Sequence, residues 1–221
     1  MILSETVQAA VADTWMVVEA IPERLDLKRK VFGDLDRLSP EDAILASNSS
    51  SYPTSQFIEA VSRPERVANT HYYRPPEVNV VEVMSCGKTT NDVIARLLER
   101  LPAYGFLPFH VAKESVGFIY NRIWAAIKRE ALAVVAEGVS TPQVVDQLFQ
   151  SVLGSRDGPF RIMDKVGLDV VLDIEEHYAA IRPGIPAEPR QLLKRYIEQG
   201  RLGIKTGKGF YSDYGEEAPT R

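Results

Sequence analysis

Apolar positions in the first half of the chain follow two alternating spacings, and this alternation predicts an α/β fold. Compact apolar runs bounded by turn residues indicate buried strands. Such runs occupy residues 15–21, 43–46, 67–72, 78–84 and 107–111. Helical spacing separates or precedes them, at residues 5–11, 25–38, 54–61 and 91–104. Strands that alternate with helical segments are typical of a sheet layered with helices.

The pattern changes after Val116, where almost every segment has helical spacing. The expected helices cover residues 118–137, 141–153, 160–180 and 191–199. Pro142 stands at a first-turn position that proline favours, and Gly138 ends the helix before it. We therefore predict two domains, an α/β domain at residues 1–112 and an all-helical domain at residues 113–221.

The composition is that of an ordinary globular protein. Hydrophobic residues make up 45% of the 221 residues, and the formal net charge of -4 argues against a nucleic-acid-binding function. No apolar run approaches the roughly 18 residues that cross a bilayer. A single cysteine, Cys86, precludes an internal disulfide. We expect a cytoplasmic protein without a bound metal.

Four polar residues in separate segments suggest acid–base chemistry: Ser50, His71, Glu82 and Asn121. A histidine with a carboxylate to orient it can take a proton from an alcohol. Hydroxyl and amide groups can hold the oxygen of the same substrate. The set therefore predicts an enzyme that moves a proton on and off an oxygen atom.

Each of these four residues also has an ordinary structural alternative. His71 could be a strand-end histidine, since Pro75 and Pro76 follow shortly after it. Glu82 could face solvent from an alternating strand, and Ser50 could belong to a capped turn. Asn121 could bond to the backbone near a helix start.

No glycine precedes Gly33. A glycine-rich turn that leads into a helix usually holds the pyrophosphate of a dinucleotide. We therefore expect that the chain begins after such a unit, and that it does not bind NAD tightly by itself.

Seven short segments, in this order, resemble the 3-hydroxyacyl-CoA dehydrogenase family over nearly the whole chain. They lie at residues 18–23, 46–51, 81–83, 117–122, 157–160, 164–169 and 205–211. The resemblance implies a partial, N-terminally truncated Rossmann-like sheet and an all-helical C-terminal domain. It also implies a homodimer formed through that second domain, an acyl-CoA or another oxygenated acid as substrate, and NAD as cofactor.

The resemblance further implies a role for each matching residue. His71 would be the catalytic base and Glu82 the carboxylate that orients it, while Ser50 and Asn121 would bond the substrate oxygen. Three residues would contact the ribose and nicotinamide side of the cofactor: Glu23, Lys28 and Asn48. For Lys28 the ordinary alternative is a solvated lysine on a charged helix face.

One local departure from the family concerns the residues that follow the histidine. The family usually has two aromatic residues and then Asn-Pro, whereas here Tyr72 and Tyr73 precede Arg74 and Pro75. A guanidinium beside the base would disfavour a protonated His71 and repel an oxidised nicotinamide. It could also bind a carboxylate or phosphate of the substrate.

Three hypotheses follow from the sequence. The first is a dehydrogenase in which His71 removes the hydroxyl proton during hydride transfer to NAD. The second is a cofactor-independent enzyme that uses the same His71 and Glu82 for isomerisation, cyclisation, elimination or aldol-type cleavage, with Arg74 as an anchor for an acidic group. The third is a non-catalytic dimeric protein that has kept the helical domain for association.

Overall fold

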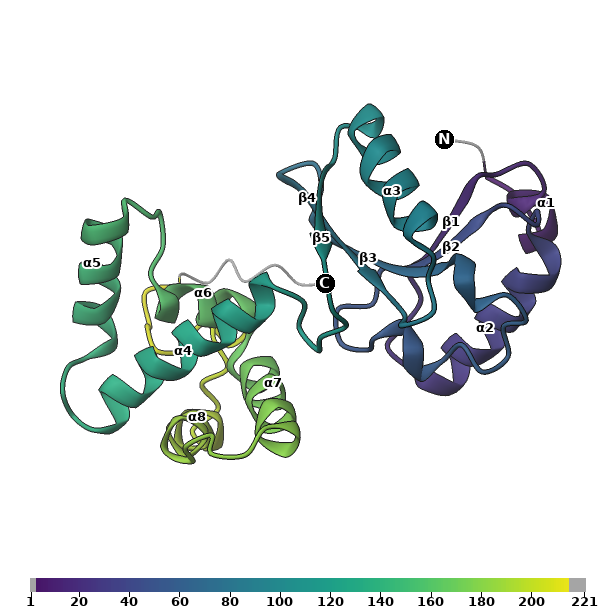
Figure 1. The fold of residues 1–221 in the computed structure, drawn as a ribbon. Coiled ribbons are helices and arrows are strands. Elements are labelled where there is room, and N and C mark those ends of the chain that lie inside the picture. Colours follow the sequence, from purple (N-terminus) through teal and green to yellow (C-terminus); the bar gives the residue numbers. More distant parts are fainter. Residues whose placement is uncertain (1–2, 215–221) are drawn as a thin grey trace. The chain divides into compact units, whose positions relative to one another are not determined.

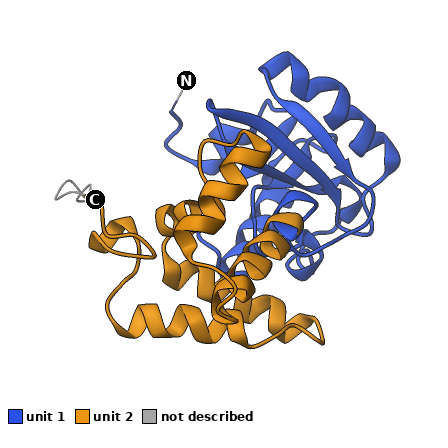
Figure 2. Cartoon of the chain, turned by 90° about the vertical axis from the view of Figure 1, so that its left-hand side faces the viewer, with its two compact units in different colours: residues 1–122 blue, residues 123–221 orange. Residues whose placement is uncertain are grey.

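The computed structural model describes residues 3–214. It divides into two compact units, residues 1–122 and residues 123–221, which Figure 2 shows in blue and orange. The division follows Arg122 and lies within a helix. The domain boundary that we expect near Lys113 stays a prediction. Among the described residues, no helix is long and apolar enough to cross a bilayer.

The first unit is built on a sheet whose five strands follow one another in sequence order (Figure 1). The strands are β1 (Met16–Glu19), β2 (Ile44–Ser47), β3 (Val67–Arg74), β4 (Val78–Ser85) and β5 (Leu107–Val111). Neighbouring strands run parallel, except that β3 and β4 pair in the antiparallel direction. All five predicted strands are present, which confirms the expectation of an α/β sheet.

Helices cover both faces of this sheet. They are α1 (Val7–Val11), α2 (Leu25–Leu38) and α3 (Asn91–Arg100), and a 3₁₀ turn at Leu101–Tyr104 extends α3. Phe32 of α2 packs with Leu45 and Val67 on one face. Leu97 of α3 packs with Val81 on the other. Apolar packing of this kind, about 25 cal/mol per Å² of buried apolar surface, holds the layers together.

The face that α2 covers also carries polar residues, at one end of the strands. Glu19, Ser47 and Asn69 are direct partners across β1, β2 and β3. His71 lies two residues beyond Asn69 and pairs with Glu82 of β4. Residues two apart on a strand point to the same side. The two polar rows therefore lie side by side on one face of the sheet.

The second unit contains most of α4 (Tyr120–Ala136), followed by α5 (Pro142–Leu153), α6 (Pro159–Val166), α7 (Leu168–Ile181) and α8 (Glu188–Glu198). Its core includes Leu132, Phe160, Leu168, Leu193 and Phe210. The aromatic ring of Phe210 belongs to the glycine-rich segment near the end of the chain, and it packs edge-on against Phe160.

Two predicted helices differ from the structure. The single helix expected at residues 160–180 is two helices, because Gly167 has a φ of 102°, which a right-handed helix cannot accommodate. The helix expected at residues 54–61 is only the 3₁₀ turn Thr54–Gln56. There, Phe57 and Val61 are buried in the core, so apolar anchoring rather than a regular helix holds the segment.

Candidate active site

The first polar row contains the His71–Glu82 pair. The two residues are partners in the antiparallel ladder, so their side chains project side by side. Only 6% of His71 and 3% of Glu82 is exposed. Nδ1 of the imidazole lies 3.4 Å from Oε2 of the carboxylate. The alternative of a solvent-facing Glu82 is wrong, because the side chain is buried.

Glu82 has hydrogen-bond donors around both carboxylate oxygens. Oε1 accepts the backbone N–H groups of Ile119 at 2.9 Å and Tyr120 at 3.1 Å, at the start of α4. Oε2 accepts the hydroxyl of Tyr73 at 2.7 Å. Burial tends to raise the pKa of Glu82, but these bonds and His71 outweigh it and hold the pKa below its ordinary value. The carboxylate is therefore ionised at neutral pH.

An ionised carboxylate can only accept hydrogen bonds, which determines the tautomer of the neutral imidazole. Nδ1 of His71 then carries the hydrogen that faces Glu82, and Nε2 is free to take a proton. A buried carboxylate beside the ring also stabilises the charged imidazolium that results. The pair therefore has the arrangement of a general base with its orienting group.

Phe118 completes the surroundings of the imidazole. Its ring stacks on that of His71, with centroids 4.8 Å apart and planes inclined by 23°. Among the described residues it is the one non-glycine residue with a positive φ, at 53°. A left-handed backbone costs a bulky residue of the order of 1–3 kcal/mol. Here this conformation accompanies both the stacked ring and the two N–H groups that reach Glu82.

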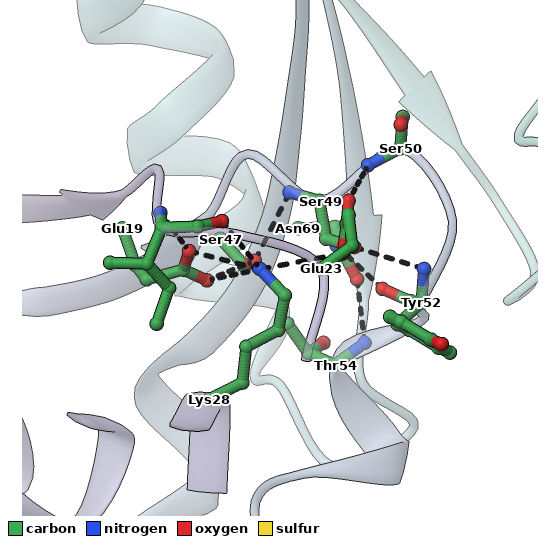
Figure 3. A network of polar contacts seen from close by, with 10 residues as sticks. Glu19, Glu23, Lys28, Ser47, Ser49, Ser50, Tyr52, Thr54 and Asn69 are labelled. Carbon is green, nitrogen blue, oxygen red and sulfur yellow. Dashed lines mark hydrogen bonds and ion pairs between the residues drawn. The ribbon is translucent and has the colours of Figure 1, made fainter. Parts of the chain in front are cut away.

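The second polar row holds a buried lysine, which Figure 3 shows at close range. Nζ of Lys28 lies 3.0 Å from Oε1 of Glu19, and both side chains are 1% exposed. The hydroxyl of Ser47 donates to the other oxygen of Glu19 at 2.7 Å. Lys28 reaches from α2 to the end of β1, so the alternative of a solvated lysine is wrong.

The same network extends to the loop after β2. Glu23 lies 3.5 Å from Nζ of Lys28, and its side chain is 37% exposed. It accepts the hydroxyl of Ser49 at 2.9 Å and the backbone N–H of Ser50 at 3.1 Å (Figure 3). Ser49 also accepts the N–H of Tyr52. The turn-forming hydroxyl is therefore that of Ser49, whereas Ser50 is exposed and its hydroxyl has no hydrogen-bond partner within residues 3–214.

The remaining predicted residues lie at several distinct places. Asn48 follows β2, and its Oδ1 accepts the N–H of Tyr72 at 2.9 Å. Asn121 is half-buried in the first turn of α4, and within the described chain its amide makes no bond to the backbone. Arg74 is exposed at the end of β3 and, in that same part of the chain, its side chain has no ion-pair or hydrogen-bond partner.

Sequence reasoning did not identify the residues that support these groups. Glu19 and Ser47 anchor Lys28, while Tyr73 and Phe118 contact the His71–Glu82 pair. One signal was available for Glu19: a carboxylate at the end of an apolar strand requires a partner when buried. Aromatic residues near a histidine give no such signal, because they are equally typical of a core.

The sheet with helices on both faces and the helical second unit define a protein with a Rossmann-like α/β domain followed by an all-helical domain. Residues 2–115 match the model of the 3-hydroxyacyl-CoA dehydrogenase NAD-binding domain, and residues 117–213 match the C-terminal domain of the same family. The chain therefore belongs to the 3-hydroxyacyl-CoA dehydrogenase family, a family of enzymes.

Individual relatives agree with this assignment. A probable 3-hydroxybutyryl-CoA dehydrogenase of Bacillus subtilis is 34% identical over 91% of this chain and 70% of its own length. The 3-hydroxyacyl-CoA dehydrogenase-like protein LAM1 of Cochliobolus heterostrophus is 44% identical over 68% of this chain, which spans 32% of that relative.

Solved structures of relatives have the same fold. The (S)-3-hydroxybutyryl-CoA dehydrogenase of Ralstonia eutropha superposes with a TM-score of 0.84 at 30% identity, over 94% of this chain and 73% of the other. The 3-hydroxybutyryl-CoA dehydrogenase of Escherichia coli gives a TM-score of 0.88 at 29% identity, over 99% of this chain and 46% of the other. The Rossmann-like sheet with a helical C-terminal domain is thereby confirmed.

Proposed function

We propose that this chain carries the proton-transfer site of a 3-hydroxyacyl-CoA dehydrogenase, with His71 as the base and Glu82 as its orienting carboxylate. The buried cross-strand pair, with Glu82 held ionised, is the observation that supports this function. Membership of the family and the names of the Bacillus and Ralstonia relatives support acyl-CoA as the substrate class.

In this proposal His71 takes the proton of the substrate's 3-hydroxyl through Nε2. Glu82 faces Nδ1 and stabilises the imidazolium as its charge develops. Ser50 and Asn121 bond the reacting oxygen. Their side chains have no hydrogen-bond partner in the described part of the chain, which keeps both available for a ligand.

The residues at the ends of β1 and β2 fit the nicotinamide and ribose side of NAD in part. Ligands of open α/β sheets bind at the carboxyl ends of the strands, where Glu23 and Ser50 lie. The partly exposed carboxylate of Glu23 can accept a ribose hydroxyl. Lys28 is enclosed by Glu19 and Glu23, so we propose that it acts on the cofactor side through Glu23. When bound, NAD supplies the acceptor of the hydride.

A pair of measurements on the same preparation tests this function. Calorimetric titration with NADH checks cofactor binding, and NADH oxidation with acetoacetyl-CoA checks turnover. We expect both, with turnover lost in His71→Gln and retained in His110→Gln. His110 is exposed on β5 in register with Val83, so it points to the face of the sheet opposite to Glu82. NADH binding without turnover in the unmodified chain would overturn the proposed function. Turnover that survives His71→Gln would overturn the role of His71.

The non-redox hypothesis can be tested separately because it needs no nicotinamide. The exposed guanidinium of Arg74, which has no partner in the described part of the chain, favours a substrate with an acidic group. It predicts a His71-dependent reaction of an oxygenated acid when NADH is absent. Arg74→Gln should then raise KM for that acid and leave kcat nearly unchanged. An equal KM for charged and uncharged substrates in both proteins would exclude this role for Arg74.

We also propose that the helical unit forms a homodimer, which is the family's implied arrangement. An apolar stripe on α5 supports it: Val144, Leu148 and Val152 lie four residues apart on one helix face and are 53%, 63% and 72% exposed. Sedimentation should show a dimer for the chain and a monomer for Leu148→Glu. Gln147→Glu, an exposed substitution on the same helix, is the matched control.

A further inference from the structure

Tyr73 contributes a hydroxyl that directly contacts the carboxylate of the acid–base pair. It lies two residues after His71, and the two rings are 4.7 Å apart between centroids. Its hydroxyl donates to Oε2 of Glu82 at 2.7 Å. Nδ1 of His71 approaches that same oxygen, but at 3.4 Å. One carboxylate oxygen therefore has two candidate donors, and the phenol makes the closer contact.

The other oxygen of Glu82 cannot relieve this competition. Oε1 already accepts two backbone N–H groups, from Ile119 and Tyr120. Burial and the neighbouring carboxylate raise the pKa of Tyr73 above its ordinary value. The phenol therefore stays protonated across the working pH range and remains a hydrogen-bond donor.

We propose that Tyr73 is a positioning residue that lowers the proton affinity of His71 by sharing the carboxylate oxygen that faces the imidazole. The inference rests on the proposed function of the His71–Glu82 pair. A carboxylate that already accepts a short hydrogen bond has less negative charge to offer a second donor. The imidazolium consequently gains less from Glu82 than it would from an unshared carboxylate.

No other described carboxylate reaches the imidazole at ion-pair distance. From α4, the Tyr120 ring packs edge-on against Tyr73 at 5.6 Å, and Arg122 donates to Ser115. On the strand of His71 itself, Arg74 is exposed and unpaired within residues 3–214. Removal of the phenol hydroxyl thus changes the surroundings of Glu82 Oε2 without removing a charge.

The test is an NMR titration of the histidine side chains in the unmodified chain and in Tyr73→Phe. The chain has three histidines, and the exposed His110 and His177 serve as internal references. We expect the midpoint of the His71 titration to move to higher pH by about half a unit, which corresponds to about 0.7 kcal/mol. The reference midpoints should not move.

Tyr120→Phe is the matched control, because it removes a nearby phenol that makes no hydrogen bond to Glu82 through its hydroxyl. It should leave the His71 midpoint in place. Tyr73→Leu removes the same hydroxyl but leaves a side chain of a different shape. It should move the His71 midpoint to higher pH, as Tyr73→Phe does. An unmoved or lowered His71 midpoint in both Tyr73 variants would overturn the proposal.

The titration requires no turnover, so it separates this inference from the proposed function. If the chain is active, the acidic limb of the kcat/KM profile should move to higher pH in Tyr73→Phe, by the same amount as the NMR midpoint. A moved midpoint in an inactive chain would support the role of Tyr73 and contradict the proposed dehydrogenase function. An active chain whose His71 midpoint does not move would support the dehydrogenase function and contradict the role of Tyr73.

Discussion

The two polar rows on the sheet face differ in how completely their charges are paired. Lys28 lies 3.0 Å from Glu19, both side chains are 1% exposed, and Ser47 binds the carboxylate as well. Nδ1 of His71 lies 3.4 Å from Glu82, and Nε2 has no hydrogen-bond partner within residues 3–214. A buried ion pair with short hydrogen bonds keeps its geometry, whereas a histidine at a longer distance from its carboxylate can gain or lose a proton.

The two rows therefore have different roles in neighbouring parts of one sheet. The Glu19–Lys28 pair fixes Glu23, and Glu23 in turn holds the backbone of Ser50. In the His71–Glu82 pair the short hydrogen bonds are those to the carboxylate, whereas the imidazole has ring contacts with Phe118 and Tyr73 and the 3.4 Å approach to Glu82. We therefore expect substitutions of Glu19 or Lys28 to affect stability most, and substitutions of His71 to affect activity most.

The largest effect should come from His71→Gln. Loss of a general base typically lowers turnover by about 10²–10⁴-fold. The unfolding free energy of the first unit should change by less than about 1 kcal/mol, because His71 makes no short hydrogen bond. Steady-state assays and urea denaturation measure the two quantities. A large loss of stability would contradict the contrast between the rows.

The next largest effect should come from Lys28→Met, which leaves Glu19 buried without its partner. Breaking a buried ion pair from one side costs about 3–5 kcal/mol. Urea denaturation should therefore show a marked loss for the single variant. The double variant Glu19→Gln with Lys28→Met removes both charges and should recover much of the free energy of unfolding that the single variant loses. Equal losses in both variants would show that packing, not charge, is responsible.

The stability contribution of Glu82 should depend on pH. Its pKa is lower in the folded protein than the ordinary value of 4.5. The ionised group therefore favours folding above about pH 4.5, and this contribution is lost as pH falls through the folded-state pKa. The stability difference between the unmodified chain and Glu82→Gln should shrink on acidification. Glu77→Gln, at an exposed position, should show no such trend.

The smallest effects should distinguish the two adjacent serines. Ser49→Ala removes a hydroxyl bonded to Glu23 and Tyr52 and should cost about 1 kcal/mol of stability. Ser50→Ala removes a hydroxyl that has no partner among residues 3–214, so stability should change by less than about 0.5 kcal/mol, while turnover falls. If Ser50→Ala turned over normally, its proposed contact with the substrate oxygen would be wrong.

The strands could be predicted because each is a compact apolar run between turns. Most helices also followed from spacing, but the division at Gly167 did not. Glycine within a helical pattern is tolerated in some helices and ends others, and only its φ of 102° decides. At residues 54–61 the spacing predicted a helix that is absent. Phe57 and Val61 are four residues apart because both are buried in the core, not because they share a helix.

The site was accessible from sequence only in part. His71 and Glu82 are eleven residues apart, and only the strand register shows that they face each other. The burial of Lys28 depends on Glu19, which lies on a different element, so spacing alone suggested a solvated lysine. Tyr73 and Phe118 were missed because their roles depend on ring orientation and backbone conformation.

The two N–H groups that bind Glu82 belong to the start of α4, the helix that continues into the second unit. A protein engineer who wished to move the His71–Glu82 pair into another scaffold could not move two strands alone. Without the turn at Phe118 and the beginning of that helix, the grafted carboxylate would lose half of its donors and would protonate more readily. The smallest transferable unit is therefore a hairpin together with a helix start.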